Sequence, residues 1–196
     1  MNTRAVDGYY GQLTPTIKTV LQLTPRETEQ TQAAIGRFLA DYHAAQARNV
    51  RAVPPTDKDL QGHKPEDTRV FEVPALGEEF KALRQGFFEE LGSVLGEGRL
   101  ALFRGALKGW MPADEDVGEI SNLAAVVNYD RRERFYRPNP GDTALRWGFA
   151  ARGSTIGASL KLDEISEPFR APLQDWLDLA RSQPDPDAPA IKSSNK

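Results

Sequence analysis

Residues 144–162, ALRWGFAARGSTIGASLKL, decide the fold class because their side chains alternate with a period of two. Large apolar residues alternate with polar or small ones up to Ala151, and the alternation resumes at Ile156 after a Gly153-Ser154 turn. This pattern is typical of two antiparallel strands with one apolar face, joined by a tight turn.

The same alternation extends towards the N-terminus. Residues 123–129, LAAVVNY, predict a central strand, and residues 131–137 predict its neighbour. The sequence NPGD at 139–142 marks the turn into the strand that follows. Together these segments predict an antiparallel meander of three or four strands.

In the residues that precede the meander, the apolar side chains recur with the helical period of 3.6 residues. Thr24, Pro25 and Glu27 form a capping box with proline at the first helical position, which predicts a helix from Pro25 to about Asn49. A second helix is predicted for residues 78–94, a break at LGEGR (95–99), and a third helix to about Lys108. A last helix is predicted over residues 167–181.

Helices that precede a run of hairpin strands predict the α+β class rather than an alternating parallel sheet. We expect a two-layer sandwich in which helices cover the apolar face of the meander. The predicted organisation is an N-terminal helical segment (1–50), a Pro-rich linker (51–69), an α+β sandwich domain (70–181) and a disordered tail (182–196).

Composition limits the possible chemistry. The chain has 196 residues, a net charge of -3 and no cysteine, which excludes disulfides, thiolate-ligated metals and a thiol nucleophile. No apolar run is long enough to span a membrane, and the first residues contain no apolar signal segment. The compartment stays open: a cytoplasmic protein, or an exported domain without its export or anchor segment.

The sequence contains no recognisable catalytic motif. His43 falls in the long helix and His63 in the predicted linker, and neither has metal-ligand spacing around it. A nucleophile elbow, a phosphate loop and a dinucleotide fingerprint are absent, and the acidic residues 114–116 lack the spacing of a calcium loop. We therefore predict no catalytic, cofactor-binding or metal-ligating residue and no cofactor.

Residues 131–137, RRERFYR, form the most basic segment. Arginines interleaved with aromatic residues could stack on bases and hold phosphates. The alternative is the solvent face of a sheet whose edge is protected by charge. The acidic total favours this alternative, so no nucleic-acid partner is expected.

The long helix carries an apolar stripe that is either core or a contact surface for a protein partner or a second copy of the chain. The stripe consists of Ile35, Phe38, Leu39 and Tyr42. The leading hypothesis is a non-enzymatic interaction or structural domain that uses this helix. The alternative is a small-ligand-binding protein or small enzyme with a pocket between sheet and helices, lined by Trp110, Tyr129, Arg146 and Trp147.

Two resemblances bear on the compartment. Leu23-Thr24-Pro25-Arg26-Glu27 resembles the helix starts of the Spy/CpxP class of periplasmic helical proteins, with Glu27 where their motif has glutamine. The order of Tyr10, Gly11, Leu13, the Leu-Thr-Pro helix, the Pro-rich segment and the late strands is similar to extracytoplasmic domains of membrane-anchored proteins of planctomycete and verrucomicrobia-type bacteria. These resemblances imply an exported domain and carry no activity.

Overall fold

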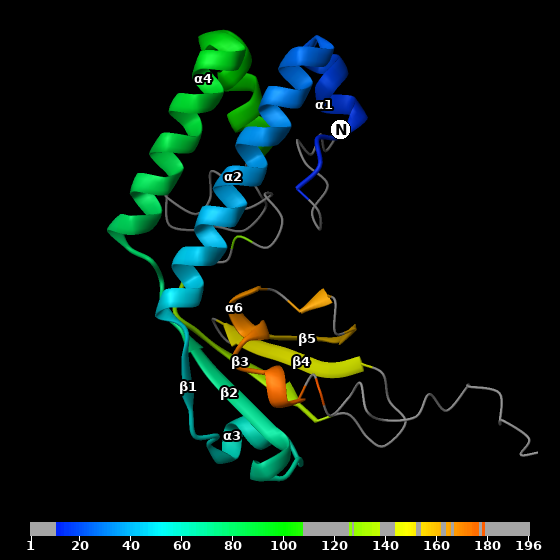
Figure 1. Cartoon of the computed structure of the whole chain (residues 1–196), viewed down its shortest axis with the longest axis vertical. Helices are drawn as coiled ribbons and strands as arrows, with labels where there is room; N and C mark the ends of the chain where they lie inside the picture. The colour runs from blue at the N-terminus through cyan, green and yellow to red at the C-terminus, as the bar shows by residue number, and fades with distance from the viewer. Residues whose placement is uncertain are drawn as a thin grey trace, which may run out of the picture. The chain divides into compact units, whose positions relative to one another are not determined.

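The computed structural model describes residues 11–107, 126, 128–137, 144–151, 154–161, 164–165, 167–176 and 178. These residues form helices and a five-stranded antiparallel sheet (Figure 1), which confirms the α+β class and raises the strand count above the predicted three to four. The chain divides into a helical unit, Met1–Gln46 with Ala75–Tyr129, and a sheet unit, Ala47–Pro74 with Asp130–Lys196. Each unit is built from two separate segments of the chain.

The helical unit contains α1 (Pro15–Val20), most of α2 (Pro25–Asn49) and α4 (Glu78–Leu107). The predicted capping box starts α2: the Glu27 carboxylate accepts the Thr24 N–H at 2.9 Å, and the Thr24 hydroxyl accepts the Glu27 N–H at 3.2 Å. The Arg99 guanidinium of α4 also bonds Glu27, at 2.7 Å. These bonds hold the pKa of Glu27 at about 2.

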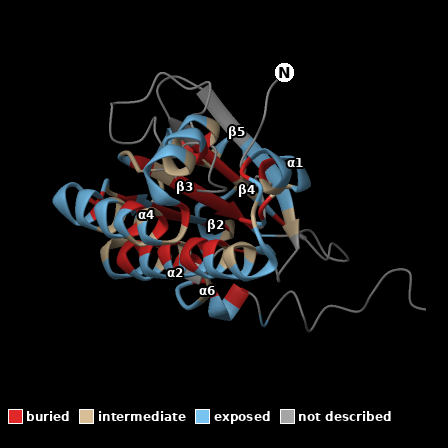
Figure 2. Ribbon diagram, turned by 90° about the horizontal axis from the view of Figure 1, so that it is seen from above, coloured by how far each residue is buried: buried red, intermediate tan, exposed pale blue. Residues whose placement is uncertain are grey.

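The helical unit has its own apolar core. On both long helices the buried positions recur at helical spacing (Figure 2), as an amphipathic pattern requires. The Phe38 and Phe87 rings stack with centroids 4.8 Å apart, and Tyr42 meets Phe80 edge-on at 5.9 Å. These aromatic contacts join α2 to α4.

Gly96 breaks the regularity of α4 where the sequence predicted a break. Its φ of 70° lies in the left-handed region that residues with a Cβ disfavour. Arg99 donates from Nε to the Leu95 carbonyl at 2.8 Å, so one carbonyl beside the kink has a side-chain partner. The two helices predicted on either side of the break are present, and they meet at Gly96 within the element α4.

The sheet unit has the strand order β1-β2-β3-β4-β5, with every neighbouring pair antiparallel. The strands are β1 (Arg51–Val53), β2 (Thr68–Val73), β3 (Arg131–Tyr136), β4 (Ala144–Ala151) and β5 (Ser154–Lys161). The hairpin predicted from residues 144–162 is β4–β5, with Leu145 opposite Leu160 and Phe149 opposite Ile156.

One face of the sheet is covered by the C-terminal segment. Its helix α6 spans Glu167–Arg170, and a turn and further helical residues follow within the described part. Phe71 and Phe135 of the sheet pack on Phe169, with ring centroids 5.6 and 5.2 Å away. The regular helix is shorter than the predicted 167–181, and a turn contains Pro172, which cannot donate a helical hydrogen bond.

Two segments differ from the predicted organisation. Residues 51–69 are not a bare linker: they form β1, α3 (Asp57–Leu60), the 3-10 turn η1 (Pro65–Asp67) and the start of β2. Of the strand predicted at 123–129, the described residues Val126, Asn128 and Tyr129 are not in a strand, and the others lie outside the described residues. The predicted meander thus supplies β3, β4 and β5, and the other two strands are β1, from the Pro-rich segment, and β2, with which it pairs.

Candidate functional site

The alternation of β3 divides the basic segment between two faces of the sheet. Successive strand residues point to opposite faces, so Arg132, Arg134 and Tyr136 share one face and Arg131 and Glu133 the other. The face that carries Arg132 and Arg134 is called the polar face below. The basic segment is therefore divided between two faces, although Arg131, Arg132 and Arg134 all border the hollow described below.

On the apolar face the charges neutralise each other. Arg131 donates from Nε to Glu133 at 2.5 Å, and both side chains are buried. The Trp147 indole donates to the second oxygen of Glu133 at 2.8 Å. These two donors compensate the buried charge of Glu133 and occupy both of its oxygens.

The short helix α3 lies on the polar face, and residues next to it in the sequence fix where it starts and ends. The Asp59 carboxylate accepts the N–H and the hydroxyl of Thr56, at 2.9 and 2.7 Å, which closes the first turn. After α3, Gln61 and Gly62 adopt φ of 47° and 87°. This left-handed pair turns the chain back towards β2.

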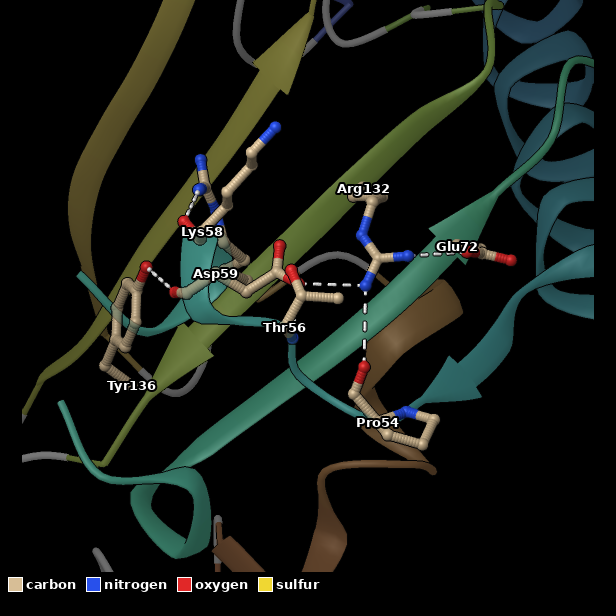
Figure 3. A network of polar contacts seen from close by, with 8 residues as sticks. Pro54, Thr56, Lys58, Asp59, Glu72, Arg132 and Tyr136 are labelled. Carbon is tan, nitrogen blue, oxygen red and sulfur yellow. Dashed lines mark hydrogen bonds and ion pairs between the residues drawn. The ribbon is translucent and has the colours of Figure 1, made fainter.

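Three arginine and tyrosine contacts attach α3 to β3, as Figure 3 shows for Arg132 and Tyr136. Arg132 bonds Asp59 at 2.9 Å, the Tyr136 hydroxyl donates to the Asp59 carbonyl at 2.8 Å, and Arg134 Nη1 donates to the Lys58 carbonyl at 3.3 Å. Every one of these contacts is polar, so α3 is held on the sheet by directed bonds.

Both terminal nitrogens of Arg132 have hydrogen-bond partners. Besides Asp59, Arg132 bonds Glu72 at 2.6 Å and reaches the Pro54 carbonyl at 3.5 Å (Figure 3). Burial raises the pKa of Asp59, but the bonds from Thr56 and Arg132 outweigh it and leave the pKa below its ordinary value. Arg132 and Asp59 thus form a charged clamp at the edge of the site.

Arg134 differs from Arg132, its neighbour on the same face. Its side chain is buried, yet Nε and Nη2 have no hydrogen-bond partner and each exposes less than 1 Å². In the register of the sheet it lies between Val70 on β2 and Gly148 on β4, neither of which has a polar side chain. Buried charged donors without acceptors are costly, so this group needs an explanation.

Arg134 lines a hollow of about 560 Å³ on the sheet unit, called the Arg134 pocket here. Its walls are α3, the start of β1, the C-terminal end of β2 and the first residues of β3. The lining residues are Arg51, Thr56, Lys58, Asp59, Glu72, Val73, Pro74, Asp130, Arg131, Arg132 and Arg134. A hollow of this volume accommodates a small molecule.

The predicted partner-binding stripe lies in the core of the helical unit. Ile35, Phe38 and Tyr42 are buried, and Leu39 is half-buried against the same cluster. Their apolar surface is therefore largely covered by the chain itself, which is the core alternative of the sequence analysis. A contact role for these residues stays a prediction.

The predicted pocket residues do not form one site among the described residues. Trp110 lies outside them, and Tyr129 belongs to the helical unit. Arg146 and Trp147 are adjacent on β4 and so point to opposite faces, with Arg146 exposed and Trp147 bonded to Glu133. None of these three described residues lines the Arg134 pocket.

Sequence reasoning found Arg134 as part of a basic segment but missed Asp59 and α3. The missed signal is the Thr56-x-x-Asp59 pattern, a capping box inside the segment predicted as a linker. Its prolines and charges obscured the pattern. His63 of the same segment stacks on Tyr136 with ring centroids 4.2 Å apart.

Within the described residues, no three histidine or carboxylate side chains gather as a metal site would require. None of the helices described there is long and apolar enough to cross a membrane. Comparison of the chain with protein-family models, curated proteins and solved structures finds no match. The resemblances to bacterial extracytoplasmic domains stay predictions, and function is argued from geometry.

Proposed function

We propose that this protein is a non-enzymatic binding domain and that the Arg134 pocket holds a small anionic ligand. The observation that carries the proposal is the buried guanidinium whose Nε and Nη2 have no partner at the wall of a pocket of about 560 Å³. Protein atoms cover both nitrogens, and an anion that displaced these atoms from the pocket wall would supply the missing acceptors.

The chemistry of the lining favours binding over catalysis. No histidine lines the pocket among the described residues, and Asp59 is bonded by Thr56 and Arg132. With its pKa lowered, Asp59 stays ionised and paired, and is poorly suited to take a proton near neutral pH.

The test is the thermal unfolding midpoint of the protein in acetate, phosphate or sulfate, with sodium chloride keeping the ionic strength constant. A bound anion at a hundred times its dissociation constant adds about 2.7 kcal/mol to the free energy of unfolding. For a chain of this size, that raises the midpoint by roughly 5–10 °C.

The variant Arg134→Met is expected to lose this anion-dependent rise. Arg146→Met is the matched control, because Arg146 is an exposed arginine on the same face and does not line the pocket. The proposal fails when no anion raises the wild-type midpoint, or when Arg134→Met responds as strongly as the wild type.

A second proposal concerns the helical unit, as a contact element for a second copy of the chain. Its support is a hollow of about 340 Å³ between α2 and α4, lined by Phe38, Leu83, Gly86 and Phe87 among others. A Cβ at Gly86 would meet no atom within 4 Å, so Gly86→Leu fills the hollow without a clash at Cβ.

Light scattering across a concentration series tests this second proposal. Self-association through the hollow predicts a molar mass that rises with concentration in the wild type and stays monomeric in Gly86→Leu. A wild-type mass that is monomeric at every concentration would exclude it.

A further inference from the structure

We infer that the ligand of the Arg134 pocket binds through a carboxylate, which Arg134 holds side-on with Nε–H and Nη2–H. The inference rests on the function proposed above and names the chemical class of the ligand.

The positions of the unpartnered atoms carry the inference. Nε–H and Nη2–H lie on the same edge of the planar guanidinium and point in nearly parallel directions. A carboxylate presents two oxygens in one plane, which matches this edge with two parallel hydrogen bonds. Nη1 belongs to the other edge and donates to the Lys58 carbonyl at 3.3 Å. The vacant pair is thus the one pair that forms a side-on fork.

The described chain supplies no acceptor for this fork. Across the sheet, the row that contains Arg134 also holds Val53, Val70, Gly148 and Gly157, which bring no side-chain oxygen to it. Two carboxylates of the polar face, Asp59 and Glu72, are bonded to Arg132 instead. An acceptor from outside the chain fits a group that the fold leaves unsatisfied.

The charge of the pocket favours one carboxylate over a doubly charged phosphate. Five basic and three acidic side chains line the pocket, and Glu133 neutralises one of the basic ones, Arg131, on the opposite face. One positive charge remains, which a single carboxylate balances. A phosphate dianion would leave an excess negative charge beside Asp59, Glu72 and Asp130.

Access to the fork requires a movement of the pocket wall, because Nε and Nη2 are covered by protein atoms. The element bonded to Arg134 on this face is α3, a helix of four residues attached to β3 through Arg132, Arg134 and Tyr136. A shift of so short an element would uncover the fork without changing the register of the sheet. The carboxylate then replaces the protein atoms that cover the two donors.

The experiment follows the Nε–H signals of the arginines in a ¹H–¹⁵N spectrum of the full chain, while acetate, succinate, phosphate or sulfate is added at constant ionic strength. The Arg134 signal is assigned by its absence in Arg134→Lys. We expect acetate to move this signal downfield in a saturable way, and succinate, which carries two negative charges, to bind no more tightly than acetate. Arg134→Lys keeps the charge but lacks the fork, and is expected to bind carboxylates about ten- to a hundredfold more weakly. Arg146→Lys is expected to bind like the wild type.

The outcomes separate this inference from the proposed function. Binding of phosphate or sulfate at Arg134 without binding of carboxylates overturns the carboxylate assignment and leaves the anion-binding function standing. A signal that no anion moves overturns both. Equal carboxylate affinity in wild type and Arg134→Lys overturns the side-on geometry.

The same spectrum distinguishes two sources of the carboxylate, a free small acid or the C-terminus of a peptide. The probes are a tetrapeptide with a free C-terminus, its C-terminal amide, and acetate. Tighter binding of the free-acid peptide than of acetate, with none of the amide, assigns the carboxylate to a chain end. Binding of acetate and succinate alone assigns it to a small acid. Binding of the amide at Arg134 contradicts the carboxylate assignment.

Discussion

At the scale of single residues, two arginines two positions apart on β3 have opposite roles. Arg132 is bonded to Asp59, Glu72 and the Pro54 carbonyl, whereas Arg134 uses only Nη1. Identical residue types on one face of a strand therefore differ in what their neighbours supply. The difference follows from β2 and α3, which are distant from β3 in sequence.

This difference predicts opposite effects of two matched substitutions on the free energy of unfolding in the absence of ligand. Arg132→Met is expected to lower it by about 1–3 kcal/mol, because buried Asp59 loses its charged partner but keeps two bonds from Thr56. Arg134→Met is expected to leave it unchanged or raise it by up to about 2 kcal/mol, since it removes buried donors that have no acceptor.

Urea unfolding of the two variants and the wild type in an anion-poor buffer measures both effects. A large loss of stability in Arg134→Met would contradict this prediction, because it would show that Nε and Nη2 already have an acceptor within the protein.

At the scale of elements, the start of α2 is stabilised both by its own sequence and by α4. The capping box of Thr24 and Glu27 is local, but the Arg99 bond to Glu27 joins residues 72 positions apart. Arg99 is available there because α4 continues beyond the kink at Gly96. The Glu27 carboxylate therefore links the first turn of α2 to α4.

The coupling predicts how stability depends on pH. The side-chain bond from Arg99 and the bonds from Thr24 lower the pKa of Glu27 from 4.5 to about 2 in the folded protein. Because the pKa of Glu27 is lower in the folded protein than in the unfolded chain, its ionised carboxylate stabilises the fold at pH values above about 4.5. This contribution is lost as the pH falls from about 4.5 to about 2.

The measurement is the free energy of unfolding at several pH values for the wild type, Glu27→Gln and the control Glu29→Gln, which removes an exposed carboxylate of the same helix. Glu27→Gln is expected to flatten the pH dependence below pH 4.5 more than Glu29→Gln does. Equal slopes in the two variants would show that the capping box does not contribute through its charge.

At the scale of the whole molecule, two apolar cores are built from interleaved segments of one chain. The helical core includes Phe80 and the sheet core Phe135, and both side chains are almost fully buried. Each unit is formed by two segments of the chain that are separated in sequence, and its core is complete only when both segments meet. Such non-local pairing delays the completion of a core during folding.

Separate cores predict separate responses to truncation. Phe80→Ala and Phe135→Ala are each expected to lower the stability of their own unit by about 3–5 kcal/mol. Hydrogen exchange of the full chain is expected to accelerate in α2 and α4 for the first variant and in β2–β4 for the second. Acceleration throughout the chain in both variants would show that the units unfold as one.

The sequence by itself determined those features of the elements that have local causes. The capping box at Thr24, the break at Gly96 and the alternation of residues 144–162 depend on neighbours within a few positions, and the structure confirms all three.

Only the tertiary structure decided which element covers each face of β3. The proline and charge content of residues 51–69 concealed β1 and α3, whose stability comes from partners on β2 and β3. The candidate site depends on the register that sets Arg134 beside Val70 and Gly148, and no local pattern encodes a register between distant strands.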